Sequence, residues 1–202
     1  MKSIKKLFVL FLFTLLSACS EQRLPPIPEN GVVLAFGDSL TAGVGAEPAD
    51  DYPTVLGELT GLHVVNSGVS GETTDEGLKR LPGVLDRHNP SLMILLEGGN
   101  DILRNMNRDQ VRDNLSQMIK LAKDRDISVV LIGVPEKKLF SDSAPLYQEL
   151  ADYHDVPLES SILADLLRSL KYKSDPIHLN DAGYLKLAER LQQWLEENGA
   201  IN

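Results

Sequence analysis

Short aliphatic runs recur along the chain, and each ends at small or polar residues. The runs occupy residues 32–36 (VVLAF), 64–65 (VV), 92–96 (LMILL) and 129–132 (VVLI). Near-continuous aliphatic runs are typical of strands that are buried on both faces of a parallel sheet. The pattern therefore predicts a parallel sheet, and we expect about five strands in it.

Amphipathic helical patterns separate these runs. One stripe at helical spacing consists of Val111, Leu115, Met118 and Ala122. A longer stripe predicts a final helix and consists of Tyr184, Leu187, Ala188, Leu191, Trp194 and Leu195. Residues 75–88 also predict a helix, in which Pro82 predicts a break. Strands that alternate with helices predict an α/β fold, a three-layer αβα sandwich with right-handed crossovers.

The first residues have the pattern of an export signal. A basic start precedes an apolar run at residues 7–16, which is shorter than the roughly 20 residues that span a bilayer. Residues 16–19 (LSAC) resemble the lipobox of bacterial lipoproteins, in which the chain is cut before a cysteine that becomes acylated. We therefore predict a signal peptide at residues 1–18 and lipidation of Cys19. The alternative is a plain secreted protein whose cysteine is incidental.

The predicted anchor sets the expected organisation and location. Residues 19–31 are predicted to form a Pro-rich linker after the lipidated cysteine, since Pro25, Pro26 and Pro28 favour an extended chain. The domain is predicted to span residues 32–202. We expect a monomer in the periplasm of the bacterial cell envelope, held to a membrane through Cys19. Ser20 after the cysteine favours the outer membrane by resemblance to other lipoproteins.

Composition and charge exclude several classes of protein. A chain of 202 residues with 43% hydrophobic and 24% charged residues is typical of one globular domain. The net charge of −9 argues against a nucleic-acid partner, which requires a basic surface. A single cysteine excludes an internal disulfide and a zinc site built from several cysteines.

Small and polar residues gather directly after the predicted strands. GDSL at residues 37–40 follows the first strand, NSGVSG at 66–71 the second, and GGND at 98–101 the third, while DPIH at 175–178 precedes the final helix. Gly37 is expected to let the backbone bend after the first strand. Ligands of such sheets bind at the carboxyl ends of the strands, so we expect these segments to meet there.

These segments contain the groups that acyl transfer needs: a serine, a base, an acid that orients the base, and donors for an oxyanion. Ser39 lies at a strand-to-helix turn, and Asp175 is within one local turn of His178. The Ser39 and Gly71 backbone N–H groups and the Asn100 side chain can supply three donors. A side chain at Gly71 would block the approach of the backbone to the oxyanion.

Taken together and in this order, the four segments resemble those of the SGNH (GDSL) hydrolases over about residues 32–195. The resemblance extends to the lysophospholipase/acyl-CoA thioesterase I and arylesterase branch, which carries a phrase like LKRLPGVL at residues 78–85. It implies a flavodoxin-like fold with strand order 2-1-3-4-5 and neither a metal nor another cofactor. The loop after Asp101 would gate the acyl pocket, and Glu97 is an acid close to the site.

The same resemblance implies a role for each matching residue. Ser39 would be the nucleophile, with Asp175 and His178 completing the triad. The Ser39, Gly71 and Asn100 donors would form the oxyanion hole. The predicted function is hydrolysis of carboxylic ester or thioester bonds in lysophospholipids, short or medium acyl esters, or aryl esters.

Other interpretations of these residues remain open from the sequence. Ser39 can instead cap a helix, and Ser70 lacks the Gly-x-Ser-x-Gly spacing of a nucleophile elbow and is interpreted as a turn residue. Asp38 and Asp101 could hold Mg²⁺ for phosphoryl transfer, although structural hydrogen bonding by both is favoured. Alternative functions are an envelope glycan O-deacetylase and a lipid-binding lipoprotein without catalysis.

Overall fold

A computed structural model describes residues 24–136 and 142–201. Its single sheet has five parallel strands in the order β2-β1-β3-β4-β5, as predicted. The strands are β1 (Val32–Gly37), β2 (His63–Gly68), β3 (Leu92–Leu96), β4 (Ser128–Ile132) and β5 (Leu158–Glu159). The sequence did not locate β5, because two residues are too few to form a recognisable aliphatic run.

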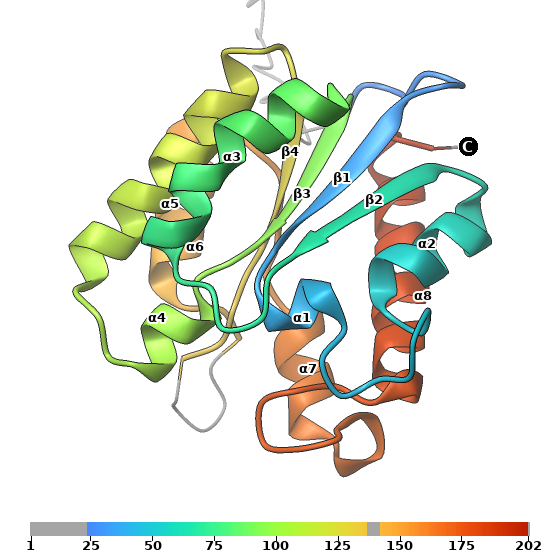
Figure 1. Cartoon of the computed structure of the whole chain (residues 1–202), viewed down its shortest axis with the longest axis vertical. Coiled ribbons are helices and arrows are strands. Elements are labelled where there is room, and N and C mark those ends of the chain that lie inside the picture. Colours follow the sequence, from blue (N-terminus) through green and yellow to red (C-terminus); the bar gives the residue numbers. More distant parts are fainter. Residues whose placement is uncertain (1–23, 137–141, 202) are drawn as a thin grey trace, which may run out of the picture.

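Helices cover both faces of the sheet and complete the predicted αβα sandwich (Figure 1). One layer consists of α3 (Thr74–His88), α5 (Arg108–Lys123) and α6 (Pro145–His154), and the other of α2 (Tyr52–Thr60), α7 (Ile162–Arg168) and α8 (Asp181–Glu197). Three shorter elements are α1 (Ser39–Ala42), α4 (Gly99–Leu103) and a 3₁₀ turn η1 (Leu170–Tyr172).

The core forms where the predicted apolar stripes meet the sheet. All five residues of β3 are buried, as is the stripe of Val111, Leu115, Met118 and Ala122 on α5. Tyr184, Leu187, Ala188, Leu191 and Leu195 of α8 are also buried, and Trp194 is partly buried against the core, so both stripes pack as predicted. Within the described residues no helix is long and apolar enough to cross a membrane.

Helix α3 continues through Pro82, so the predicted break was wrong. Leu81 and Leu85 are 0% and 1% exposed, and their burial holds the helix on both sides of the proline. At the N-terminal end, Glu76 Oε2 accepts hydrogen bonds from the Thr73 backbone N–H and hydroxyl, both at 2.9 Å. Tertiary burial and this cap together offset the lost hydrogen bond and the steric clash that proline imposes on a helix.

The segment before β1 lies along the body of the domain. The predicted linker spans residues 19–31, but Leu24 is only 6% exposed, and its N–H donates to Asn198 O at 3.0 Å. The Ile27 N–H donates to Ala200 O at 2.8 Å. The described chain is therefore packed against the C-terminal end of α8 from Leu24 onward, eight residues before β1 begins. The predicted signal peptide and Cys19 lie outside the described residues.

Candidate active site

Ser39 is the first residue of α1, directly beyond the carboxyl end of β1 (Figure 1). The cap of this short helix is Asp38, whose Oδ1 accepts a hydrogen bond from the Leu40 N–H at 3.0 Å. The alternative role of Ser39 as helix cap is therefore wrong, and its hydroxyl is available for another contact. Ser39 is 8% exposed.

Two glycines allow α1 to lie directly on the ends of the strands. A Cβ on Gly37 would lie 1.9 Å from Leu96 O, and a Cβ on Gly68 would lie 2.1 Å from Ala42 N. Gly37 is a strand residue without positive φ, so close packing, and not the expected bend, requires glycine there. Both glycines bring the backbone around Ser39 into contact with the two neighbouring strands.

Asp175 and His178 come from the loop that precedes α8. His178 Nδ1 lies 2.7 Å from Asp175 Oδ2, and His178 Nε2 lies 3.1 Å from Ser39 Oγ. A carboxylate oxygen can only accept, so Asp175 favours the tautomer with the ring proton on Nδ1. Nε2 then presents a lone pair to the Ser39 hydroxyl. The fold thus joins three residues, separated by up to 139 positions, into one hydrogen-bonded chain.

The loop itself fixes the orientation of Asp175. Its Oδ1 accepts the backbone N–H groups of Ile177 and His178, both at 2.8 Å. The side-chain hydrogen bond to His178 is the largest influence on the pKa of Asp175, which falls to about 2, and the two backbone donors act in the same direction. Asp175 is therefore a carboxylate at neutral pH and keeps the imidazole in place.

Gly71 lies in a turn after β2 with a φ of +80°, which favours glycine. The space beside it is open, because an added Cβ would meet only Arg104 Nη2, at 3.9 Å. The backbone conformation, and not the predicted blocking of space, therefore explains the glycine. Arg104 Nη2 also donates to Gly71 O at 2.9 Å, which fixes the orientation of this peptide group.

Asn100 lies in the first turn of α4, and its amide bridges two of the segments after the strands. Nδ2 donates to Glu72 O at 2.9 Å and lies 3.4 Å from Asp38 Oδ2. The second hydrogen bond is long and therefore weak, so a ligand in the site can compete for that amide hydrogen. The structure joins Ser39, His178 and Asp175 directly and places Asn100 on the same cavity wall, while Gly71 is linked to Asn100 through the carbonyl of the neighbouring Glu72.

Residues 35–186 match the model of the GDSL-like Lipase/Acylhydrolase family. The chain belongs to this family. It is a serine hydrolase of the SGNH type and acts on ester bonds.

Two curated relatives and one solved structure show how far the likeness extends. The chain is 34% identical over 180 residues to an arylesterase from Vibrio mimicus, covering 84% of this chain and 86% of that protein. It is 31% identical over 156 residues to thioesterase 1/protease 1/lysophospholipase L1 from Escherichia coli K12, covering 73% and 75%. The crystal structure of TesA superposes with a TM-score of 0.77 at 26% identity, covering 83% of this chain and 99% of that one.

Buried acids lie behind the nucleophile segment of this GDSL hydrolase. Burial is the main cause that raises the pKa of Asp38 to about 6. Burial and the charge of Asp38 hold the pKa of Glu97 well above its ordinary value. Glu97 Oε1 accepts the Gly98 N–H at 3.1 Å, whereas its buried Oε2 has no partner among the described residues. The resemblance placed Glu97 near the site, but its burial was not apparent from the sequence.

Asp101 makes structural hydrogen bonds, the role that the sequence analysis favoured for it over binding of Mg²⁺. Its two carboxylate oxygens accept the Thr74 backbone N–H at 3.0 Å and the Thr74 hydroxyl at 2.7 Å. Across the described residues, no group of three or more His, Cys, Asp or Glu side chains is arranged to hold a metal ion. Asp101 thus joins the start of α3 to α4, and so positions the segments that carry Gly71 and Asn100.

A cavity of about 670 Å³ opens in front of Ser39 and His178. Its apolar walls come from several elements and include Ile102, Leu103, Val134, Leu167 and Ile177. Ile102 and Leu103 belong to α4, so the segment directly after Asp101 forms part of the wall, where the family resemblance places the acyl pocket. The cavity can hold an apolar group next to the serine hydroxyl.

Proposed function

We propose that Ser39, His178 and Asp175 form the catalytic triad of this hydrolase, with the Ser39 N–H, the Gly71 N–H and Asn100 Nδ2 as the oxyanion hole. The observation that carries the proposal is the continuous hydrogen-bonded chain from Asp175 through His178 to Ser39 Oγ at the wall of the cavity. A serine, a base and an orienting acid in this order are what nucleophilic acyl transfer needs.

The proposed reaction has two half-reactions. Ser39 Oγ attacks the ester carbonyl carbon while its proton passes to His178 Nε2, and the oxyanion accepts hydrogen bonds from the three donors. The C–O or C–S bond then breaks as His178 returns the proton to the leaving alcohol or thiol. Water then attacks the acyl carbon while its proton passes to His178, the bond from that carbon to Ser39 Oγ breaks as His178 returns the proton to Oγ, and the carboxylic acid leaves. Asp175 stabilises the imidazolium through both stages.

The proposed substrates are lysophospholipids, short or medium acyl esters, aryl esters and acyl thioesters. The apolar walls of the cavity favour an acyl chain over a free acetyl group. The two relatives, an arylesterase and a thioesterase/lysophospholipase, support the same range. A series of 4-nitrophenyl esters of increasing acyl length tests this choice, since strict acetate preference would favour the alternative function as a glycan O-deacetylase.

Labelling with a fluorophosphonate tests the nucleophile without a natural substrate. The wild type should react, and Ser39→Ala should not. Ser70→Ala is the matched control, because Ser70 is exposed in the neighbouring turn and should label like the wild type. His178→Ala should lose most labelling and most ester turnover while keeping its circular dichroism spectrum. Normal labelling of Ser39→Ala would refute the assignment.

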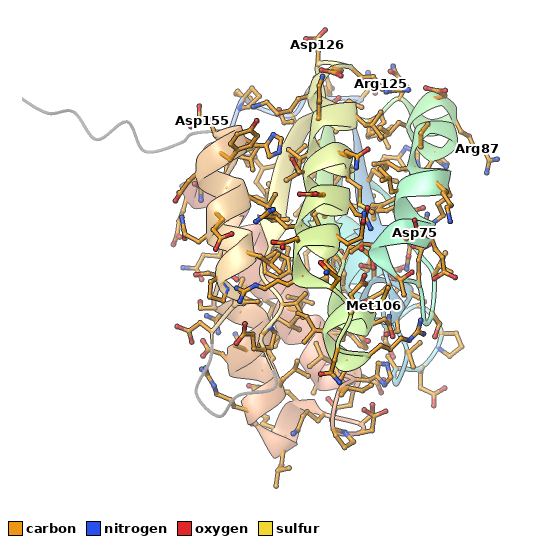
Figure 2. The ribbon with its side chains drawn as sticks, turned by 90° about the vertical axis from the view of Figure 1, so that its left-hand side faces the viewer. Asp75, Arg87, Met106, Arg125, Asp126 and Asp155 are labelled. Atoms are coloured by element: carbon orange, nitrogen blue, oxygen red, sulfur yellow. The ribbon has the colours of Figure 1, made fainter. Side chains whose placement is uncertain are left out.

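We further propose that the protein is a monomeric lipoprotein of the cell envelope, anchored through Cys19. Leu24 and Pro25 line a surface pocket with Asp126 and Asp155, which lie at one end of the molecule (Figure 2). α1, and with it Ser39, lies at the carboxyl end of the strands, the opposite end in Figure 1. Cys19 is only five residues before Leu24, so the tether would be short and the site would open away from the anchoring bilayer.

Two measurements test this location. Incorporation of an alkyne-tagged fatty acid should depend on Cys19 and disappear in Cys19→Ser, and light scattering of the domain should give the mass of one chain. A tagged protein that persists in Cys19→Ser would refute lipidation at this residue.

A further inference from the structure

Lys173 lies at the base of the loop that carries Asp175 and His178. It forms an isolated antiparallel bridge with Leu179, which is fully buried. Asn180 Nδ2 donates to Lys173 O at 3.2 Å, and the Ser174 N–H donates to His178 O at 3.1 Å. The backbone of Lys173 is therefore fixed next to the candidate base, while its side chain lines the same cavity as Ser39 and His178.

Two other charged side chains of the cavity wall, Arg168 and Glu136, are paired with oppositely charged residues. Arg168 Nη2 lies 3.0 Å from Asp142 Oδ1 and its Nη1 3.1 Å from Asp165 Oδ1. Glu136 Oε1 lies 3.6 Å from Arg108 Nη1. These pairs leave little net charge on their part of the wall.

Lys173 differs from these residues, because its ammonium group contacts no carboxylate in residues 24–136 and 142–201. The internal segment 137–141 (KKLFS) contains no acid that could pair with it. The chain has 29 acidic and 20 basic residues, and two acids of the same cavity wall, Asp38 and Glu136, form no ion pair with Lys173 in the part of the chain that the structure describes. The result is a half-buried lysine in the wall of the cavity in front of the serine.

We propose that Lys173 binds an anionic group of the substrate, so that this hydrolase prefers esters that carry a phosphate or carboxylate beside the scissile bond. The proposal rests on the function proposed above and adds a specificity-determining residue to it. The apolar walls would hold the acyl chain, and the lysine would form a charge-assisted hydrogen bond with the anionic part of the leaving group. The partly apolar surroundings strengthen this contact relative to one in bulk water.

Paired soluble esters measure the preference directly. The substrates are 1-butyrylglycerol 3-phosphate and the uncharged 1-butyrylglycerol, which differ only in the phosphate. We expect the wild type to have a kcat/KM about fivefold higher for the phosphate ester, as one half-buried charge pair allows, and expect the ratio to fall as salt is added. Lys173→Gln should abolish the ratio, because kcat/KM should fall more for the phosphate ester than for the neutral ester, and Lys173→Arg should restore it.

Lys171→Gln is the matched control. Lys171 is exposed, and its Nζ lies 5.1 Å from the Tyr172 ring centroid, so the same charge change occurs two residues away. This variant should keep the wild-type ratio. A long-chain lysophosphatidic acid, compared with the monoacylglycerol of equal chain length, identifies the source of the anion. If the preference for the phosphate is larger than in the soluble pair, the anion is a lipid headgroup. If the two preferences are equal, the enzyme accepts any anionic ester.

The failure of each proposal has its own signature. Equal turnover of both soluble esters by the wild type, or an equal loss on both in Lys173→Gln, would overturn the role of Lys173 and leave the triad intact. Absence of fluorophosphonate labelling and of turnover on every ester would overturn the proposed function itself.

Discussion

Arg80 joins helix α3 to the loop that carries Gly71. Its Nε and Nη2 donate to the two carboxylate oxygens of Glu72, each at 2.6 Å. Nη1 donates to Ser67 Oγ at 2.8 Å and Nη2 to Ser67 O at 2.9 Å, while the guanidinium carbon lies 3.9 Å from the centroid of the Phe36 ring. Glu72 O in turn accepts the Asn100 amide. Arg80 therefore supports the backbone next to Gly71, which is proposed to supply one oxyanion donor, and the Glu72 carbonyl that orients another, the Asn100 amide.

The exposure of the Arg80–Glu72 ion pair determines how much free energy of unfolding should be lost when Arg80 is removed. The side chains of Arg80 and Glu72 are 24% and 4% exposed. Removing one partner of a buried ion pair costs about 3–5 kcal/mol, because the other charge stays buried without compensation. Water can reach part of the space that Arg80 leaves, which favours the lower end, and the lost contact with Phe36 adds about 0.5–1 kcal/mol. We expect Arg80→Ala to lower the free energy of unfolding by about 3–4 kcal/mol.

Urea unfolding followed by circular dichroism measures this change, with Lys79→Ala as the control. Lys79 pairs with Asp75 at 2.6 Å on the same helix, but the two side chains are 71% and 54% exposed. An exposed pair contributes about 0.2–1 kcal/mol, and alanine suits a helix as well as lysine or arginine does. A loss in Arg80→Ala within about 1 kcal/mol of that in Lys79→Ala would refute the reasoning.

Three further changes test the site and its surroundings. Asn100→Ala should lower kcat about 10²–10³-fold with an unchanged fold if its amide donates to the oxyanion, and a loss below about threefold in ester assays would contradict this. Because burial raises the pKa of Asp38 to about 6, folding should lose about 3 kcal/mol of stability as pH rises from about 4 to above 6. In Asp38→Asn the free energy of unfolding should not fall over this pH range. A fall as large as that of the wild type would contradict the prediction. Gly71→Ala should cost about 1–2 kcal/mol, measured by urea unfolding, because its φ of +80° strains any side chain; no loss would mean that the turn relaxes.

The sequence largely predicted the parts of the fold that depend on local patterns. Aliphatic runs identified four of the five strands, and helical stripes identified α5 and α8. Both are visible because a strand or helix that is buried on one or both faces has a regular pattern of apolar residues. The same logic failed for β5, which is too short to leave a pattern, and for Pro82, where packing of Leu81 and Leu85 overrides a local rule. The strand order came from resemblance to a family and was confirmed.

The segments after the strands named the candidate site residues, since their residue types and order are visible without coordinates. Only the tertiary structure decided which contacts they make. Asp38 and not Ser39 caps α1, and a backbone φ explains Gly71. Arg80 lies in the LKRLPGVL segment, but that segment did not reveal its contacts with Glu72 and Ser67, and Lys173 belongs to no motif that the sequence analysis identified. Burial, pairing of charges and cavity shape each depend on many segments that only the fold brings together. The sequence therefore determined which groups are present, and the structure determined their surroundings.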